Sequence, residues 1–393
     1  MFINFWYPVI RSQDLGNKPE RVTIMRHDFV VFRDDSGAPA VLSDTCVHRG
    51  GSLAGGKCKS DGTVQCPYHG WRFTREGVCV RIPSLGIKAK IPPRARVDAY
   101  PVCEKYGVVF AFLGDLPEAE RPPILPIEED KDPNWRSTVA TFDVDYHYER
   151  SIENGLDPAH NEYVHTTHGY QGEREEEYKV NELEPHRNNP WGFGFMHTFD
   201  APPLRNPIMR FARSKGGKMQ AGSGTYGPNQ MWTFIHFSPT KCMHQYMFEA
   251  PIDENRTRVF LVNFRNVLFF RGALTRKLNG WLDSKIHERN MFVARQDIRV
   301  VRHLKPTLTP PSTAKELLMP ADKVIVQYRD KLQEFEDRGW RIDWENLKRA
   351  HAQGDVIYAI PSPARRETKA WVLDCVPLVP PLDPASGAVR AVR

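Results

Sequence analysis

The sequence predicts an α+β protein of two domains, and three observations support this. Short strand-like segments separated by Gly, Pro and Asp follow one another over residues 22–113 and predict a small antiparallel β domain. Strand-like segments with alternating aromatic residues recur over residues 178–263 and predict a second sheet. A long helical pattern then covers residues 271–303 and is closed by two prolines. We therefore expect an all-β domain followed by a sheet that packs with helices.

A stretch rich in structure-breaking residues separates the two predicted domains. It contains Pro122, Pro123 and Pro126 together with a short acidic run, a composition typical of a linker. A helix is expected soon afterwards, near residues 148–166. A chain of 393 residues is long enough for two hydrophobic cores. The expected boundaries are residues 1–116 for the first domain, 117–134 for the linker and 135–393 for the second domain.

Two loops of the first domain each offer one cysteine and one histidine. Cys46 and His48 come first, and Cys66 and His69 follow after an interval of seventeen residues. Two thiolates and two imidazoles suit a Rieske [2Fe–2S] cluster, in which both cysteines bind one iron and both histidines bind the other. Structural Zn²⁺ also accepts this ligand set, but zinc loops more often pair like residues. The pattern therefore predicts a Rieske cluster, with zinc as the alternative.

Charge and composition limit the kinds of partner. Residues 1–115 contain 16 Lys and Arg against 11 Asp and Glu, so they hold +5 of the net charge of +6. The basic residues in or beside the cluster loops are Lys57, Lys59, Arg72, Arg75 and Arg81. They form either an ordinary solvated surface or a docking face for an acidic electron donor. No dense basic run with interleaved aromatic residues is present, so nucleic acid is not an expected partner.

The sequence carries no pattern typical of export or of membrane insertion. Its longest apolar runs are far shorter than the ~20 residues that span a bilayer. Its first residues lack a basic region and a small-residue cleavage site. Seven cysteines, an odd number of which two are assigned to iron, favour a reducing compartment. We expect a cytoplasmic protein without a transmembrane segment.

A second group of potential metal ligands lies early in the second domain. His160 and His165 are five residues apart, and two imidazoles with one carboxylate make the facial triad of non-haem Fe(II) oxygenases. The carboxylate has to come from another segment, and Asp297 on the long predicted helix is our choice. Asp283 and Glu288 on the same helix are the alternatives to Asp297. His168 is the alternative to His165.

With these two motifs together, the chain resembles the oxygenase component, or α subunit, of the Rieske non-haem iron oxygenases. The family motif D-x₂-H-x₄-H is present from Asp157 to His165, and the resemblance covers nearly the whole chain. It implies a catalytic domain of the helix-grip (START or Bet v 1-like) fold. It also implies that Asp157 joins His69 of one subunit to His160 of the next, since a carboxylate can accept both imidazole N–H groups. A head-to-tail trimer follows from this, and Asn154 is expected to lie beside the iron.

The resemblance implies a reaction as well. Electrons from NAD(P)H would arrive through a separate reductase or ferredoxin and would serve to activate O₂ at a mononuclear Fe(II). The chain itself shows no nucleotide-binding G-x-G-x-x-G motif, because the match from Gly222 to Gly227 lies within the strand-like stretch and does not open a helix. It also has no plant-type ferredoxin cysteine spacing. The segment Phe5-Trp6-Tyr7-Pro8 and the residues around His160 are similar to the branch with chlorophyll a oxygenase, pheophorbide a oxygenase and bacterial enzymes for polycyclic substrates.

Aromatic residues in the second domain favour a bulky, hydrophobic substrate. We expect about half of them to form the core of the sheet and the others to face a cavity. They are Trp191, Phe193, Phe195, Phe199, Trp232, Phe234, Phe237 and Phe248. Hydroxylation or oxidative dealkylation is the expected reaction, and cis-dihydroxylation of an aromatic ring is the alternative. Two functions other than that of an oxygenase remain open. One is a Rieske electron-transfer protein with a lipid-binding START-like domain, and the other is a lipid-binding protein stabilised by zinc.

Overall fold

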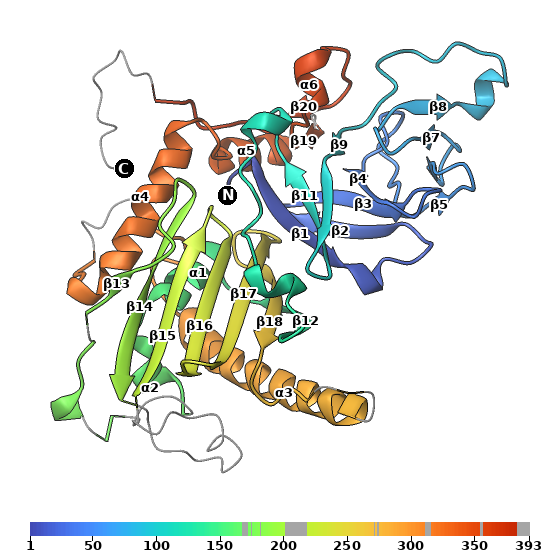
Figure 1. Cartoon of the computed structure of the whole chain (residues 1–393). Coiled ribbons are helices and arrows are strands. Elements are labelled where there is room, and N and C mark those ends of the chain that lie inside the picture. Colours follow the sequence, from blue (N-terminus) through green and yellow to red (C-terminus); the bar gives the residue numbers. More distant parts are fainter. Residues whose placement is uncertain are drawn as a thin grey trace. The chain divides into compact units, whose positions relative to one another are not determined.

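The computed structural model describes residues 1–166, 172–173, 175–180, 182–200, 218–270, 272, 275–310, 316–353 and 357–382. The chain forms two compact units, shown in Figure 1. Unit 1 consists of Met1–Ile124, Ala250–Asp253 and Glu334–Val389, and unit 2 consists of Leu125–Glu249, Glu254–Gln333 and Arg390–Arg393.

Unit 1 is built from small sheets. Its strands are β1 (Phe5–Arg11), β2 (Glu20–Ile24), β3 (His27–Arg33), β4 (Pro39–Ser43), β5 (Lys57–Cys58), β6 (Val64–Gln65), β7 (Arg72–Phe73), β8 (Cys79–Arg81), β9 (Ala99–Tyr100), β10 (Val102–Lys105), β11 (Val108–Leu113), β19 (Tyr358–Ala359) and β20 (Asp374–Cys375). The first eleven form antiparallel sheets in the orders β1-β11-β10, β2-β3-β4-β9 and β5-β6-β7-β8. The expectation of an all-β N-terminal part is confirmed.

The end of the described chain belongs to unit 1, whereas we expected everything after residue 134 to form the second domain. The segment contains α5 (Trp344–Gln353) and α6 (Ala364–Glu367) as well as β19 and β20. Aromatic packing explains the difference, because Phe5 lies with its ring centroid 4.7 Å from that of Phe335 and 5.6 Å from that of Trp340. A buried ion pair adds to this, since Arg365 contacts the fully buried Asp98 at 2.7 Å. Neither contact is visible in the local sequence pattern.

Unit 2 is organised around one seven-stranded sheet. Its strands are β12 (Arg136–Val144), β13 (Glu184–Pro185), β14 (Gly192–Asp200), β15 (Lys218–Tyr226), β16 (Gln230–Ser238), β17 (Lys241–Pro251) and β18 (Thr257–Arg265). They lie in the order β12-β18-β17-β16-β15-β14-β13. The sheet and its helices confirm the expected α+β class of the second part of the chain.

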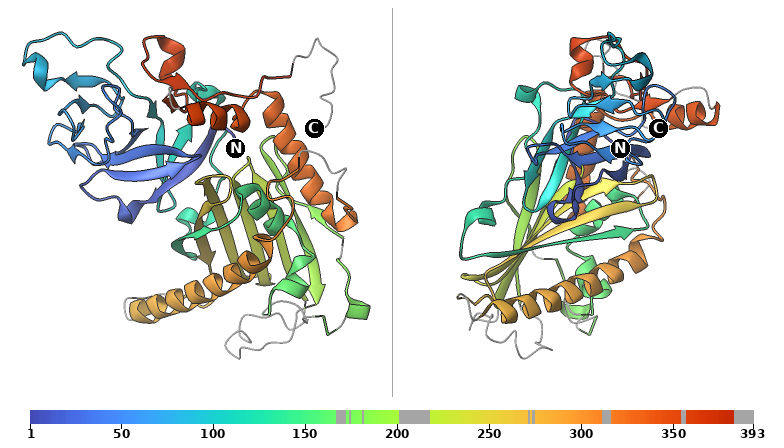
Figure 2. Two further views of the ribbon diagram at one scale, coloured as in Figure 1. Left: turned by 180° about the vertical axis from the view of Figure 1, so that it is seen from behind. Right: turned by 90° about the vertical axis from the view of Figure 1, so that its right-hand side faces the viewer.

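Four helices accompany this sheet, namely α1 (Tyr148–Leu156), α2 (His160–Val164), α3 (Arg276–Val301) and α4 (Lys323–Asp337). Helix α1 contacts β15, β16 and α3, and α2 contacts α3. Seen from behind in the left view of Figure 2, α1 and α3 lie in front of the sheet, so both cover the same face. The helix expected over residues 148–166 is divided in two, because Pro158 lacks the N–H that a continuous helix requires.

The two faces of the sheet carry different side chains. Met231 on β16 faces α1, because a Cβ atom at Gly155 of α1 would lie 2.1 Å from its Cε. Its neighbour Trp232 therefore points to the opposite face, where it lies over Gly224 of the adjacent β15 and Gly194 of β14, the next strand. Those two glycines leave the space that the indole ring occupies.

The alternation divides the aromatic residues between the two faces of the sheet. By register, Phe234 and Phe248 lie with Trp232 on the face away from α1, where Trp232 and Phe248 are almost fully buried. Phe193 and Phe195 alternate with Gly194 and lie on the face toward α1. Phe199, four residues after Phe195 on β14, shares that face. These three residues can thus approach a site between the sheet and these helices.

Among the described residues, no helix is both long and apolar enough to cross a membrane.

Candidate metal centres

The two cysteine–histidine loops of unit 1 have matching backbone geometry. In the first loop the N–H of Gly50 donates to the carbonyl of Cys46 at 2.9 Å, and in the second the N–H of Gly70 donates to the carbonyl of Cys66 at 3.1 Å. Gly50 and Gly70 have φ values of 69° and 72°, a left-handed conformation that glycine adopts without strain. Each loop therefore turns tightly after its cysteine and presents its histidine.

The four side chains divide into a buried pair and an exposed pair. Cys46 and Cys66 are each only 2% exposed, whereas His48 and His69 are exposed. The two imidazole centroids are 4.4 Å apart, and the ring of Trp71 stacks on that of His48 at 4.7 Å. The structure thus brings together all four residues predicted to hold the cluster, with the thiols inside and the imidazoles at the surface.

This arrangement fits a two-iron cluster better than one zinc ion. Burial and the neighbouring Cys66 raise the pKa of Cys46 to about 12, against a backbone hydrogen bond at His48 that lowers it, so the thiolate form needs a cation close by. In the described part of the chain, two groups of side chains have ligand atoms close enough together to hold one ion, and neither group contains any of these four residues. A [2Fe–2S] cluster fits this geometry, because the two cysteines bind one iron and the two histidines bind the other.

The second predicted centre is assembled in unit 2. Ligand atoms of His160, His165 and Asp297 lie within 4.8 Å of one another. The Oδ1 atom of Asp297 on α3 is 3.3 Å from Nε2 of His165 and 3.6 Å from Nε2 of His160. His165 is 3% exposed, so the group is shielded from solvent.

Hydrogen bonds on the far side of each imidazole orient the two rings. Nδ1 of His160 lies 2.7 Å from the backbone carbonyl oxygen of Asp157, and Nδ1 of His165 lies 3.1 Å from Oε1 of Gln296. Both acceptors place the imidazole proton on Nδ1, so both Nε2 atoms turn their lone pairs toward Asp297. Burial also lowers the pKa of His160, which keeps this ring in the neutral form that metals require.

The alternatives to Asp297 are engaged elsewhere. Asp283 accepts hydrogen bonds from Arg136 at 2.8 Å and from Arg265 at 2.8 Å. Glu288 is exposed and pairs with Lys285 at 2.8 Å. The alternative histidine, His168, lies outside the described residues.

Two known domain families match the chain on either side of the predicted linker. The family described as "Rieske [2Fe-2S] domain" matches residues 5–100, and the "Vanillate O-demethylase oxygenase C-terminal domain" matches residues 144–338. The first match contains both cluster loops, and the second contains His160, His165 and Asp297. The chain belongs to the Rieske oxygenases.

Several curated Rieske oxygenases are similar to this chain over part of their length. The α subunit of phenoxybenzoate dioxygenase from Ectopseudomonas oleovorans is 35% identical over 42% of this chain and 42% of its own. Pheophorbide a oxygenase from Arabidopsis thaliana is 32% identical over 73% of this chain and 54% of its own. The matches span between 31% and 55% of the lengths of the eight curated relatives compared.

Solved Rieske oxygenases share the fold at lower identity. The structure of NdmA from Pseudomonas putida CBB5 with caffeine has a TM-score of 0.66 and 24% identity, and covers 89% of this chain and 92% of that one. Dicamba monooxygenase bound to dicamba has a TM-score of 0.63 and 20% identity, with coverage of 84% and 96%. Both similarities concern the fold alone.

The two further residues that the family resemblance singled out lie next to the triad. The side-chain amide of Asn154 donates to Oδ1 of Asp297 at 3.1 Å. The carboxylate of Asp157 accepts the N–H of Ala159 at 2.7 Å, and its other oxygen is 3.8 Å from Nδ1 of His160. The side chain of Asp157 is 25% exposed, which leaves one of its edges open to a neighbouring molecule.

A buried ion-pair network that sequence analysis missed supports α1. Glu153 receives hydrogen bonds from Arg150 and from Arg329 of α4, each at 2.6 Å. Glu316 joins the same two arginines at 3.5 Å and 2.5 Å. The network ties the helix that carries Asn154 to α4. Charged residues spaced at i and i+3 in a predicted helix were the only sign of it in the sequence.

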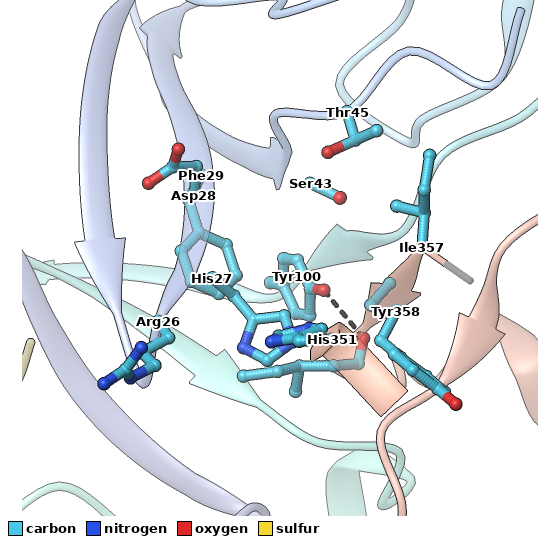
Figure 3. A pocket seen from close by; sticks show the side chains of 12 residues that line it. Arg26, His27, Asp28, Phe29, Ser43, Thr45, Tyr100, His351, Ile357 and Tyr358 are labelled. Carbon is cyan, nitrogen blue, oxygen red and sulfur yellow. Dashed lines mark hydrogen bonds between the residues drawn. The ribbon is translucent and has the colours of Figure 1, made fainter. Parts of the chain in front are cut away.

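Unit 1 also contains a polar cavity of about 290 Å³ that no motif foretold. Figure 3 shows His27 and His351 close together in it, and their ring centroids are 6.5 Å apart. Burial lowers the pKa of His27 to about 4, so this ring is neutral. Thr45, which also lines the cavity, directly precedes Cys46, one of the residues predicted to bind the cluster.

Proposed function

We propose that this Rieske oxygenase is the terminal oxygenase component of a multicomponent system and inserts oxygen into a bulky, ring-containing substrate. The observation that carries the proposal is the convergence of His160, His165 and Asp297, because two imidazoles and one carboxylate form the facial triad that leaves coordination positions open for O₂ and substrate. An electron carrier of the Rieske ferredoxin kind has no use for such a group.

Each side chain has a role in this proposal. Cys46, His48, Cys66 and His69 hold the [2Fe–2S] cluster. His160, His165 and Asp297 hold Fe(II), which supplies the activation of O₂ when it is bound. Asn154 holds the carboxylate of Asp297 in place through its hydrogen bond.

Electrons come from outside the chain in this proposal. NAD(P)H reduces a separate reductase, directly or through a ferredoxin, and the reduced partner docks beside the exposed His48 and His69. The basic residues of this region contribute less to docking than their number suggests, because Arg72 pairs with Asp61 at 3.0 Å and Arg75 with Asp34 at 2.5 Å. Lys57 and Lys59 are exposed and suit an acidic partner.

Transfer between the two centres uses Asp157. We propose that its carboxylate accepts an N–H from His69 of one subunit while it stays beside His160 of its own, within a head-to-tail trimer. The partial exposure of Asp157 and its distance of 3.8 Å from His160 Nδ1 support this. The remaining exposed edge is available to the neighbour's imidazole.

Monooxygenation is the proposed reaction. One atom of O₂ enters a C–H bond, the other leaves as water, and two electrons and two protons are consumed. If the hydroxylated carbon bears an ether oxygen, the product loses an aldehyde, which is dealkylation. The name of the relative 5,5'-dehydrodivanillate O-demethylase from a Sphingobium strain, 26% identical over 64% of this chain, supports that outcome. The names of two dioxygenase relatives support cis-dihydroxylation as the second candidate.

The first experiment counts metal. Protein purified without oxygen should contain three irons and two acid-labile sulfides per chain. Two irons with two sulfides that persist after Fe(II) is added back would reject the oxygenase and leave a carrier.

The second experiment identifies the reaction. Reduced protein is incubated with aryl ethers, methoxylated aromatic compounds and tetrapyrroles under ¹⁸O₂, and the masses of the products are measured by mass spectrometry. One labelled oxygen in the product indicates monooxygenation and two indicate dihydroxylation. Coupling of NAD(P)H consumption to product, once a reductase is supplied, checks the need for a partner.

A further inference from the structure

A second group of metal-binding side chains lies on unit 2 and plays no part in the proposed oxygenase chemistry. Ligand atoms of His236, Cys242 and His244 lie within 4.8 Å of one another. The two Nε2 atoms of His236 and His244 are 3.0 Å apart and face each other. Cys242 and His244 are buried, and His236 is partly buried.

Strand register explains why these three residues meet. In the β16–β17 hairpin His236 is paired directly with Cys242, and Phe234 is paired with His244. Directly opposed residues of an antiparallel pair point to the same face, as do residues two apart on one strand. His236, Cys242 and His244 therefore share one face near the turn that closes the hairpin. It is the face that carries Trp232, opposite to the face that α1 covers.

A hydrogen bond orients His244 in the way that is usual for a metal-binding histidine. Its Nδ1 lies 2.5 Å from Oε1 of Glu129, and the hydroxyl of Tyr246 donates to the other oxygen of that carboxylate at 2.7 Å. A carboxylate on Nδ1 places the imidazole proton there and leaves the lone pair of Nε2 free for a metal. Metal-bound histidines nearly always have such an acceptor on their second nitrogen.

The surroundings fix the ring further. Phe234 stacks on His244 with centroids 3.9 Å apart, and Trp135 lies at 4.7 Å. The backbone N–H of Cys242 donates to the side chain of Asn266 at 2.8 Å, which anchors the strand that carries the thiol. The ligand positions are thus set by packing and hydrogen bonds before any ion arrives, which lowers the entropic cost of binding.

We propose that His236, Cys242 and His244 form a binding site for one divalent ion of the Zn²⁺ kind, separate from both iron centres. In a tetrahedral zinc site with Zn–N distances of ~2.0–2.1 Å the two nitrogens are about 3.3 Å apart, close to the 3.0 Å found here. One thiolate with two imidazoles suits zinc, and three protein ligands leave the fourth position to water. Binding displaces the thiol proton of Cys242 and moves the second imidazole proton away from Nε2.

The ion would act as a clamp. It would join the two strands of the hairpin to each other and, through Glu129, to the 3₁₀ turn Glu128–Lys131 that precedes β12. Metal binding to the folded chain alone stabilises it by mass action. The site therefore gives the sheet a metal dependence that is independent of O₂ chemistry.

The test counts zinc rather than activity, so it does not depend on the proposed oxygenase reaction. The background variant is His160→Ala, which removes one ligand of the triad and so keeps zinc out of it. This variant and the double variant His160→Ala/His236→Ala are each equilibrated with Zn²⁺ and freed of loosely bound metal by gel filtration. We expect about one zinc per chain in the first and a loss of at least tenfold in the second. Equal zinc content in the two would overturn the proposal.

Ligand identity is tested at the zinc X-ray absorption edge, where iron does not interfere. The spectrum should show one sulfur at ~2.3 Å and two nitrogens at ~2.0–2.1 Å. Cys242→Ser should lose the sulfur signal, and Cys103→Ser, a partly buried thiol on β10 of unit 1, should keep it. A spectrum of oxygen and nitrogen alone in the His160→Ala background would mean that the ion binds elsewhere and would also overturn the proposal. Circular dichroism and urea denaturation show that unit 2 of each variant is folded, and the retained [2Fe–2S] absorption shows the same for unit 1.

Discussion

Asn154 of α1 and Asp297 of α3 join these two helices, since the amide of Asn154 donates to Oδ1 of Asp297 over 3.1 Å. That same oxygen faces Nε2 of His165 and Nε2 of His160. Burial raises the pKa of Asp297, while both histidines and the amide of Asn154 lower it. The amide therefore favours the ionised carboxylate that a metal requires, and it fixes the oxygen that would bind the ion.

Asn154→Ala should weaken the mononuclear site without dismantling it. Loss of a hydrogen bond to a ligating carboxylate typically costs 10–100-fold in metal affinity. The measurement is the iron retained against a graded series of chelator concentrations. Asn161→Ala is the matched control, because the hydrogen bond of that amide among the described residues goes to the carbonyl of Pro158, at 3.5 Å. Equal iron retention in the two variants would show that Asn154 does not support the ligand.

Asp297→Ala should remove one iron of three and leave the cluster intact. The reason is that Asp283, the other candidate carboxylate on α3 that is partly buried, is held by Arg136 and Arg265 and does not replace the missing ligand. Asp283→Asn provides the contrast. It should keep three irons yet cost about 3–5 kcal/mol of stability, because it leaves the 1% exposed Arg265 without its partner. Iron analysis and urea denaturation separate the two effects, and a reversed pattern would favour Asp283 as the ligand.

Asp157→Asn should separate reduction from turnover. The cluster should still accept an electron from dithionite, and the mononuclear iron should stay bound, since His160 is held by the backbone carbonyl of residue 157 rather than by its carboxylate. Product formation should fall at least a hundredfold. Asp322→Asn, which removes a nearby like charge, is the control and should turn over normally. Undiminished product from Asp157→Asn would contradict the bridging role.

Glu249 should make the stability of the protein depend on pH. Burial raises the pKa of this fully buried carboxyl from its ordinary 4.5 to about 8, opposed by the hydroxyl of Ser151, which donates to it at 2.6 Å. Between these values the unfolded chain has lost the proton and the folded chain retains it. The free energy of unfolding therefore falls as pH rises from about 4.5 to about 8, by at most ~1.4 kcal/mol per pH unit.

Glu249→Gln should remove that slope, because its amide is neutral in both states. Urea denaturation of unit 2, followed at several pH values in this window, provides the measurement. Glu128→Gln is a suitable control, since the Glu128 side chain is 80% exposed and its loss should leave the slope unchanged. A slope that persists in Glu249→Gln would assign the pH dependence to another group.

Glu153→Gln should destabilise unit 2 strongly. Glu153 lies between Arg150 and Arg329, both only 5% exposed, and its neutralisation leaves two buried cations with less compensation. Breaking one partner of a buried pair costs about 3–5 kcal/mol. Glu288→Gln, in an exposed pair with Lys285, should change stability by less than ~1 kcal/mol. Similar losses in both variants would mean that burial does not govern these pairs.

What the sequence could predict was local. Cys46, His48, Cys66 and His69 lie in two short motifs, and the spacing from Asp157 to His165 is equally compact, so ligand chemistry alone pointed to them. Asp297 could be chosen because a helix was predicted around it, although the same helix also offered Asp283. Only the partners in the fold distinguish these two carboxylates.

What the sequence could not predict depends on register and on distant partners. Gln296 orients His165, and Arg329 reaches Glu153 from 176 residues away, without any repeated spacing to reveal them. A one-residue shift in a strand exchanges the faces, so it was not possible to tell from alternation alone that Trp232 lies away from α1. The packing of Phe335 on Phe5 likewise joins the two ends of the chain through shape rather than pattern.

The closeness of α1 to the sheet has a consequence for how this protein can change. Gly155 follows Asn154 directly, and even one methyl group there would overlap the tip of Met231. Steric contact with Met231 thus limits how closely the helix approaches β16, in addition to the hydrogen bond from Ser151 to Glu249. A larger side chain at this position requires the flexible end of Met231 to move aside or a smaller residue to replace it. Two positions 76 residues apart in the sequence are in this way coupled.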